Sequence, residues 1–477
     1  MPSLRSSAFV LLLFALLGLS GCGGTAPTSE PRMLVYRGAS GEVFDGIRSQ
    51  IRAVTSATEP SDLNRFQLVT LDGNLVSSAE IGGLNLIRRA FGSGVSVLLV
   101  NASESHKRAL LDAKLVPLSA HGTSDAYLVT PLPGGRRFHI TNLRPLRLQK
   151  RAKSQELDPD GTLTGSHGQS EADIPTSVDR IAGFVEVVKA RLGEQGRSVP
   201  VTPSPPTDYP KSSWFQVSYT DGWAVNNDPI IDWQNVDYDA TYTFYGYFDS
   251  GDSLPSKWFQ WLAFSVDASV TPSAPTSDQV DDRGYVHTMT EIYAEPDDSA
   301  GGNGLQLSLV DAQPTNANNA LSSSLQFDIG YKGQNGNTSW LWQQGLTQTM
   351  GSFGGWSGSI VPAPGNELNG TQMRFMQTTS FNGDGSNWTD ALYRVFVGRH
   401  IEPINSSSRN PIELVGQALW RTQVAYSGVV TIDVGESVLM TDIMVKNYFF
   451  TYKPNYSNNS YGTSRTFDLD LGQLAAP

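Results

Sequence analysis

The stretch SSLQFDIGYKGQNGNTSWLWQQGLTQTM, residues 323–350, alternates apolar and polar side chains on both sides of a centre rich in Gly and Asn. Before that centre, one face carries the apolar residues Leu325, Phe327, Ile329 and Tyr331, and the other face is polar. Alternation with a period of two predicts a half-buried β-strand, and Asn-Gly is a strong signal for a tight hairpin turn. The stretch therefore predicts a long amphipathic β-hairpin.

The second arm of this hairpin continues the pattern. Trp340, Trp342, Leu346 and Met350 share one register, whereas Leu341 interrupts the polar side. Each arm is about 9–13 residues long, and a strand that crosses a bilayer needs about 9–11 residues with an apolar face toward lipid. Two alternatives remain open: a hairpin that covers the core of a sandwich, or one that enters a membrane. A single hairpin has unpaired edges, so membrane entry requires several chains that close one barrel.

The rest of the chain predicts two structural regions. Residues 214–477 are nearly all short strand patterns separated by Gly, Asn, Asp and Pro, which predicts a large, mainly antiparallel β-sandwich domain that carries the amphipathic hairpin. Residues 33–133 instead alternate apolar strands with helical patterns, which predicts a small N-terminal α/β domain with a parallel sheet. Residues 134–213 are expected to form a basic and polar connector, a helix and a Pro-rich linker. The predicted fold class is thus a multidomain α+β protein. Within the α/β domain we expect strands at 33–36, 66–70, 95–100 and 126–130, and helices at 43–54, 79–90 and 104–113.

The N-terminus has a basic start, an apolar run and an exit of small residues. The apolar run of about 12 residues is shorter than the roughly 20 that span a bilayer as a helix, so residues 1–21 predict a removable signal peptide. The exit, LSGC at 19–22, resembles the lipobox of bacterial lipoproteins. The resemblance implies a diacylglycerol thioether on Cys22, the only cysteine, a lipidated tether at 22–32, and an exported protein anchored to the cell membrane or outer membrane of a bacterium. The alternative is an ordinary signal peptide with a cysteine beside its cleavage site.

Composition and motifs disfavour several classes of function. A net charge of −12 argues against a nucleic-acid partner, because phosphate binding needs clustered Lys and Arg. We expect no enzyme, no cofactor and no metal site: there is no G-x-S-x-G motif, and the six histidines lack the spacing of metal ligands. The acids available for glycoside hydrolysis show no pairing in the sequence; they are Asp232, Asp237, Asp239, Glu291 and Glu295.

A basic stretch at 136–153 contains the pair Lys150-Arg151. Exposed polar segments are preferred sites of proteolysis, so Lys150 and Arg151 are a candidate processing site for a trypsin-like enzyme. The alternative is a solvated connector.

The segments that precede the hairpin follow a distinctive order. A strand pattern ending in EIYA at 291–294 leads to LQLSLV at 305–310 and DAQPT at 311–315, and the hairpin then starts almost at once. Over roughly 238–350 this order resembles the leukocidin/hemolysin family of β-barrel pore-forming toxins. The resemblance implies a soluble protomer whose hairpin packs against the sandwich until assembly into a homo-oligomeric ring releases it into membrane lipid. It also implies a membrane-contacting rim rich in aromatic residues, for which the candidates are Trp356, Trp388 and Trp420.

The chain departs from that family in two ways. Leukocidins are freely secreted and lack an N-terminal α/β domain, so a lipid-anchored toxin would need release, for which Lys150-Arg151 is the candidate. The alternative function is a surface-tethered glycan- or protein-binding lipoprotein, with a sugar-stacking platform formed by Tyr245, Tyr247, Trp258 and Trp261. The position of the hairpin discriminates between the two: a hairpin folded against the sandwich favours the pore, and a central strand pair excludes it.

Overall fold

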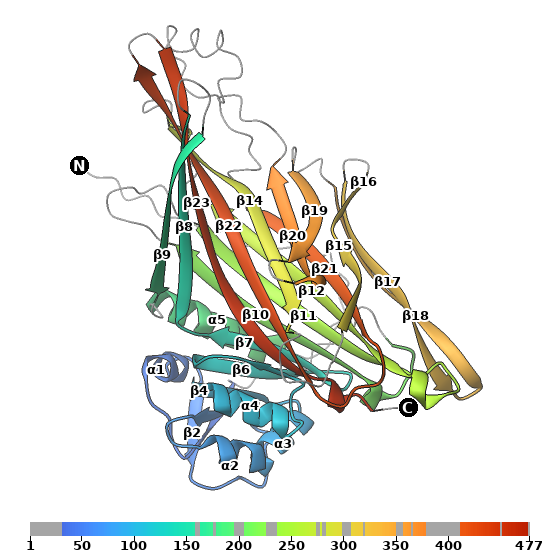
Figure 1. The fold of residues 1–477 in the computed structure, drawn as a ribbon. Helices are drawn as coiled ribbons and strands as arrows, with labels where there is room; N and C mark the ends of the chain where they lie inside the picture. Colours follow the sequence, from blue (N-terminus) through green and yellow to red (C-terminus); the bar gives the residue numbers. More distant parts are fainter. Residues whose placement is uncertain are drawn as a thin grey trace, which may run out of the picture.

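In the computed structural model, a region of helices and short strands lies at one end of two large β-sheets (Figure 1). The structure describes residues 31–157, 163–174, 178–194, 205–225, 236–272, 277–278, 283–297, 307–317, 320–349, 356–363, 366–377, 411–448 and 451–475. The predicted signal peptide, Cys22, most of the tether and Trp388 lie outside these residues. No helix in the described part of the chain is long and apolar enough to cross a membrane.

The N-terminal region contains the predicted parallel sheet. Its central strand β1 pairs in parallel with β2 and β3, and β3 pairs in parallel with β4. The elements are β1 (Arg32–Tyr36), α1 (Glu42–Arg48), β2 (Arg52–Ser56), β3 (Leu68–Asp72), α2 (Ser78–Gly83), α3 (Asn85–Gly92), β4 (Ser96–Ala102) and α4 (Glu104–Asp112). The apolar residues of β1, β3 and β4 are buried between the helices, as expected for parallel strands covered on both faces.

Two predicted helices in this region differ from the structure. The helix expected at 43–54 ends at Arg48, and β2 begins at Arg52, because the apolar positions after residue 50 satisfy a strand pattern as well as a helical one. The helix expected at 79–90 is divided into α2 and α3 at Leu84, whose extended backbone (ψ 113°) interrupts the helical hydrogen bonds.

The C-terminal region is a β-sandwich with long antiparallel strands. One layer of the sandwich is part of an 11-stranded sheet. Its strands in this region are β10 (Trp214–Val225), β11 (Val236–Asp249), β12 (Phe259–Pro272), β15 (Leu307–Gln313) and β21 (Ile412–Thr422). The other is a nine-stranded sheet that includes β8 (Leu146–Leu157), β9 (Leu163–Ile174), β14 (Arg283–Pro296), β19 (Trp356–Ala363), β20 (Asn366–Gln377), β22 (Val429–Tyr448) and β23 (Thr451–Asp470). Phe244 of the first sheet meets Phe467 of the second with ring centroids 5.4 Å apart, and the apolar core lies between the sheets.

The two regions share one continuous sheet. The strand expected at 126–130 is present as β6 (Ser124–Leu132), but it pairs antiparallel with β4, so the parallel part of the sheet ends at β4. β6 also pairs antiparallel with β7 (Arg137–Leu143), and β7 pairs in parallel with β10 of the sandwich. A short strand, β5 (Leu118–Ala120), also pairs with β23. Backbone hydrogen bonds therefore run from the N-terminal region into both sheets of the sandwich.

The segment expected as a connector is largely ordered secondary structure. It contains β7, β8, β9 and helix α5 (Val178–Glu194), whose apolar side packs against α1. Lys150 and Arg151 lie within β8, where they pair with β9 on one side and with β23 on the other. The candidate processing site is therefore part of the nine-stranded sheet and not of a solvated connector.

A buried ion network joins the two sheets of the sandwich. Arg465 of β23 contacts Glu436 of β22 and lies 3.0 Å from Asp221 of β10, and Arg144 lies 2.8 Å from the same Asp221 carboxylate. Glu436 also accepts hydrogen bonds from Trp223 at 2.7 Å and from Tyr242 at 3.0 Å, both on the opposite sheet. Burial alone would raise the pKa of Asp221, but the guanidinium groups of Arg144 and Arg465 outweigh it and hold that pKa below its usual value.

Two buried histidines predict a loss of stability in mild acid. Burial lowers the pKa of His287 to about 3 and that of His139 to about 3, while the unfolded chain binds a proton at each near 6.5. Between these values only the unfolded state is protonated, so each histidine is expected to reduce the free energy of unfolding by about 1.4 kcal/mol per pH unit as pH falls from 6.5. His287→Phe keeps a ring against Trp356, whose centroid lies 4.8 Å away, and is expected to reduce the slope by about 1.4 kcal/mol per pH unit, the share of one histidine. Urea unfolding between pH 6.5 and 4.5 measures it, and an unchanged slope would contradict the assignment.

Candidate functional site

The predicted hairpin is present and forms a sheet of its own. It consists of β17 (Ala320–Gly333) and β18 (Gly336–Thr349), extended at one edge by the short strand β16 (Thr315–Ala317). A two-residue turn at Gln334 and Asn335 joins the arms, and Gly336 adopts φ 112°, a conformation that glycine reaches without strain. Figure 1 shows β17 and β18 beside the ends of β11 and β12, outside both large sheets.

The strand register gives the hairpin two chemically different faces. Phe327 pairs with Trp342 and Ile329 pairs with Trp340, so these apolar residues share one face. Leu325, Phe327, Ile329, Tyr331 and Trp342 on that face are buried, and Trp340 is partly buried. The opposite face carries exposed polar residues, namely Gln326, Asp328, Lys332, Ser339 and Gln343, and Leu341 is its one interruption among the residues with described side chains.

The apolar face packs against what we call the aromatic wall, which consists of Tyr209, Trp214, Tyr245, Tyr247, Phe259 and Trp261. Ring centroids of Phe327 and Trp261 are 4.9 Å apart, and Trp342 lies edge-on to Tyr245 at 5.5 Å. The indole of Trp342 donates a hydrogen bond to the Tyr247 hydroxyl at 3.0 Å. Burial of each large apolar side chain contributes roughly 1.5–3 kcal/mol, so this face is the main source of the hairpin's attachment.

Asp249, at the end of β11, anchors β17 near the hairpin turn. Its carboxylate accepts hydrogen bonds from the backbone N–H groups of Gly330 at 2.9 Å and Gly251 at 3.1 Å, and from the Trp261 indole at 3.2 Å. The backbone N–H of Ser250 donates to the Gly330 carbonyl at 2.9 Å. A Cβ on Gly330 would lie 2.7 Å from the Cα of Gly251, so both positions need glycine for this close approach.

The Pro-rich segment before β10 contributes a second anchor. The Tyr331 hydroxyl donates to the Asp208 carboxylate at 2.9 Å, and the Tyr209 ring meets Tyr331 edge-on at 5.1 Å. Tyr209 is itself fixed by a 2.8 Å hydrogen bond from its hydroxyl to the Phe248 carbonyl. The segment expected to be a simple linker therefore contacts the hairpin directly.

Several residues predicted from the sequence lie elsewhere. Trp356 and Trp420 are buried in the sandwich core, which contradicts a position on an exposed rim. Inward-facing strand positions take large aromatic residues, and the Trp420 indole is satisfied there by the Asn369 carbonyl at 2.7 Å. Trp388, Met350 and the side chain of Leu346 lie outside the described part of the chain. The sugar-stacking platform is not exposed, since Tyr245, Tyr247 and Trp261 are covered by the hairpin and Trp258 packs against the core.

The anchors were not predicted. Asp208, Asp249 and Gly251 are far from the hairpin in sequence, and nothing in their local pattern distinguishes them from ordinary turn residues. Only the folded arrangement shows that they contact Gly330 and Tyr331.

No family model and no curated protein matches the sequence. Solved structures similar to the chain include Clostridium perfringens delta-toxin, which is 12% identical over 55% of this chain and 92% of the toxin, with a TM-score of 0.36. A pore forming protein is 9% identical over 54% of this chain and 94% of its own, with a TM-score of 0.34. The Clostridium perfringens NetB toxin in its membrane-inserted form is 10% identical over 54% of this chain and 96% of the toxin, with a TM-score of 0.28. These structural neighbours are toxins and pore-forming proteins, and similarity at this level does not assign the chain to a family.

Proposed function

We propose that the chain is an exported, lipid-anchored pore-forming protein that oligomerises on a target membrane and inserts one β17–β18 hairpin per chain into a shared β-barrel. The observation that supports this most is the attachment of the hairpin. It is a separate sheet held by an apolar face and a few anchors, and it is not a central strand pair of the sandwich. Such a hairpin can leave without breaking the backbone ladder of either large sheet.

The two faces of the hairpin match the two environments of a barrel strand. The face that now packs on the aromatic wall would turn toward lipid, and the polar face would line the lumen. The cost of moving the apolar face is small, because hydrocarbon replaces one apolar environment with another. The unpaired edges of β17 and β18 would be closed by hairpins of neighbouring chains, which makes insertion dependent on assembly.

The anchors at Asp249 and Asp208 oppose early release. Each hydrogen bond contributes about 1 kcal/mol, and those to a carboxylate about 1.5–3 kcal/mol. A chain alone in solution therefore keeps its hairpin docked, and the interactions that form between chains on assembly must supply the energy that breaks these bonds.

Transfer of the hairpin tip across a bilayer tests the proposal. In a Cys22→Ser background, Asn335→Cys places a single thiol at the exposed turn, and biotin maleimide labels it. The full chain is added to vesicles of phosphatidylcholine and cholesterol that contain streptavidin, with external streptavidin blocked by free biotin. We expect the label to be captured inside, together with release of an enclosed dye, because the tip must cross when the hairpin inserts.

A label at Thr58→Cys, exposed in the N-terminal region, is the matched control and should never be captured. Vesicles that stay intact, or that leak while the Asn335 label remains outside, would exclude the hairpin as the inserting segment.

A further inference from the structure

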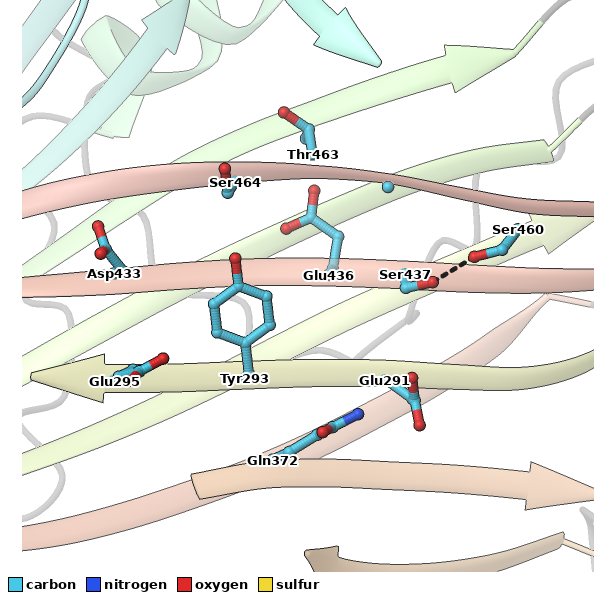
Figure 2. Close-up of a pocket in the computed structure, with 11 residues that line it drawn as sticks. Glu291, Tyr293, Glu295, Gln372, Asp433, Glu436, Ser437, Ser460, Thr463 and Ser464 are labelled. Atoms are coloured by element: carbon cyan, nitrogen blue, oxygen red, sulfur yellow. Dashed lines mark hydrogen bonds between the residues drawn. The ribbon is translucent and has the colours of Figure 1, made fainter. Parts of the chain in front are cut away.

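A second concave site lies on the nine-stranded sheet, on the face that points away from the 11-stranded sheet. The cavity has a volume of about 340 Å³ and is bordered by β14, β20, β22 and β23. Most of its side chains, such as Glu291, Tyr293 and Asp433, alternate with core residues, which places them on the outer face, whereas the buried Glu436 borders the cavity from the inner side. Figure 2 shows Tyr293 at the centre, with Glu291 and Glu295 on either side along the same strand.

Two glycines on neighbouring strands leave room in and beneath this cavity, Gly435 under the Tyr293 ring and Gly462 at the cavity border. Tyr293 pairs with Gly435, and a Cβ on Gly435 would clash with the tyrosine ring, so the ring lies against the Gly435 backbone. Gly462, on the next strand, also borders the cavity and adds no side chain. Because Tyr293 is only partly buried and lines the cavity, its remaining ring surface is available to a ligand.

Tyr293 retains its proton. Burial raises the pKa of Tyr293, and the carboxylates of Glu436, Asp433 and Glu295 raise it further. The hydroxyl of Ser464 acts in the opposite direction and lowers the pKa, but burial and the carboxylates outweigh it.

The groups around the ring include both donors and acceptors. Glu291, Glu295 and Asp433 present carboxylate oxygens, whereas Gln372 and Ser437 can donate. The Arg374 guanidinium adds further donors beside the cavity, 2.7 Å from Glu291. Sugar hydroxyls donate and accept at the same time, and the C–H face of a pyranose packs on an aromatic ring. An ammonium ligand would use only the acceptors of this cavity. Among the described residues, no group of three or more His, Cys, Asp or Glu side chains is arranged to hold a metal ion.

We propose that this cavity binds a neutral pyranose sugar of a glycan, with Tyr293 as the stacking ring and Glu291, Glu295 and Asp433 as hydroxyl acceptors. Four carboxylates border the cavity, and the guanidinium groups of Arg374 and Arg465 pair with only two of them, Glu291 and Glu436, so charge repulsion disfavours an anionic sugar. The site differs from the aromatic wall, which the hairpin covers. The inference stands independently of pore formation, since it concerns the opposite sheet and needs no movement of the hairpin.

Titration calorimetry on the full chain, without membranes, tests this inference with methyl glycosides of glucose, galactose, mannose, N-acetylglucosamine and N-acetylgalactosamine. We expect saturable binding of at least one of them. Tyr293→Leu should weaken it at least tenfold, Tyr293→Trp should retain it through the larger ring, and Glu295→Gln should weaken it several-fold. Glu413→Gln, an exposed carboxylate on the other sheet, is the matched control and should leave binding unchanged. Melting temperatures of all variants separate loss of binding from loss of fold.

The inference is overturned if no neutral glycoside binds, or if Tyr293→Leu and Glu295→Gln bind as the parent does. Preferential binding of N-acetylneuraminic acid or spermidine would also overturn it, in favour of a charged ligand. Failure here leaves pore formation untouched, because the streptavidin capture assay uses vesicles without any glycan.

Discussion

Phe327→Lys is expected to reduce dye release from vesicles by roughly 30- to 1000-fold. If the apolar face of the hairpin meets lipid, a lysine near the middle of β17 costs about 2–4 kcal/mol per chain at the centre of the bilayer. Each 1.4 kcal/mol is a factor of ten, and a ring repeats the cost in every chain. The neighbouring change Gln326→Lys lies on the exposed polar face and should leave release within a few-fold of the parent.

Phe327→Lys weakens both insertion into lipid and docking on the aromatic wall, and these two effects change dye release in opposite directions. Phe327 also packs on the aromatic wall, so lysine there weakens the docked state, which by itself would favour earlier release of the hairpin and more leakage. A fall in leakage therefore identifies the lipid contact. Trp340→Lys is a second variant on the same face, at a partly buried position. There the lysine stem can lie along the aromatic wall with its ammonium in water, so docking is weakened less. Equal leakage from Phe327→Lys and Gln326→Lys would contradict a lipid-facing role for this face.

Arg465→Met is expected to lower the free energy of unfolding by about 3–5 kcal/mol, because it leaves Glu436 buried without its cation. The melting temperature should fall on the order of 5–10 °C. The double variant Arg465→Met/Glu436→Leu should recover much of that loss, since apolar residues of similar volume can replace a buried pair.

Lys189→Met is the matched control, because it breaks the exposed pair with Glu186 and should cost under about 1 kcal/mol. Thermal and urea unfolding measure all three. If the double variant is less stable than Arg465→Met alone, the network does not act as a compensated pair, and Glu436 stabilises the sandwich chiefly through Trp223 and Tyr242.

Local sequence patterns predicted much of the fold. Strict alternation from Leu325 to Tyr331 and the Asn-Gly centre were sufficient for the hairpin, and its two faces follow from the register. The parallel strands β1, β3 and β4 were predicted because short apolar runs separated by helices have few other arrangements. The end of α1 was missed because Ile51 would be buried in either a helix or a strand.

Interactions between distant segments could not be predicted in this way. Basic residues at 147–153 suggest an exposed connector, and only the pairing with β23 shows that they lie in a sheet. Trp356 and Trp420 have no pattern that separates a core tryptophan from a surface one. The anchors at Asp208 and Asp249, and the cavity around Tyr293, depend on strands that meet only in the folded protein.

The position of β8 between β9 and β23 changes what proteolysis near Lys150 and Arg151 can achieve. A cut there would sever the chain without separating it, because both new ends remain hydrogen-bonded within the sheet. The nicked molecule would still carry its N-terminal region, which continues through β7 into β10. If Cys22 bears lipid, the tether of roughly ten residues between it and β1 can span at most about 35 Å. A nicked protein would then act only on surfaces within that distance of its own membrane. It would diffuse freely only after cleavage within the tether itself.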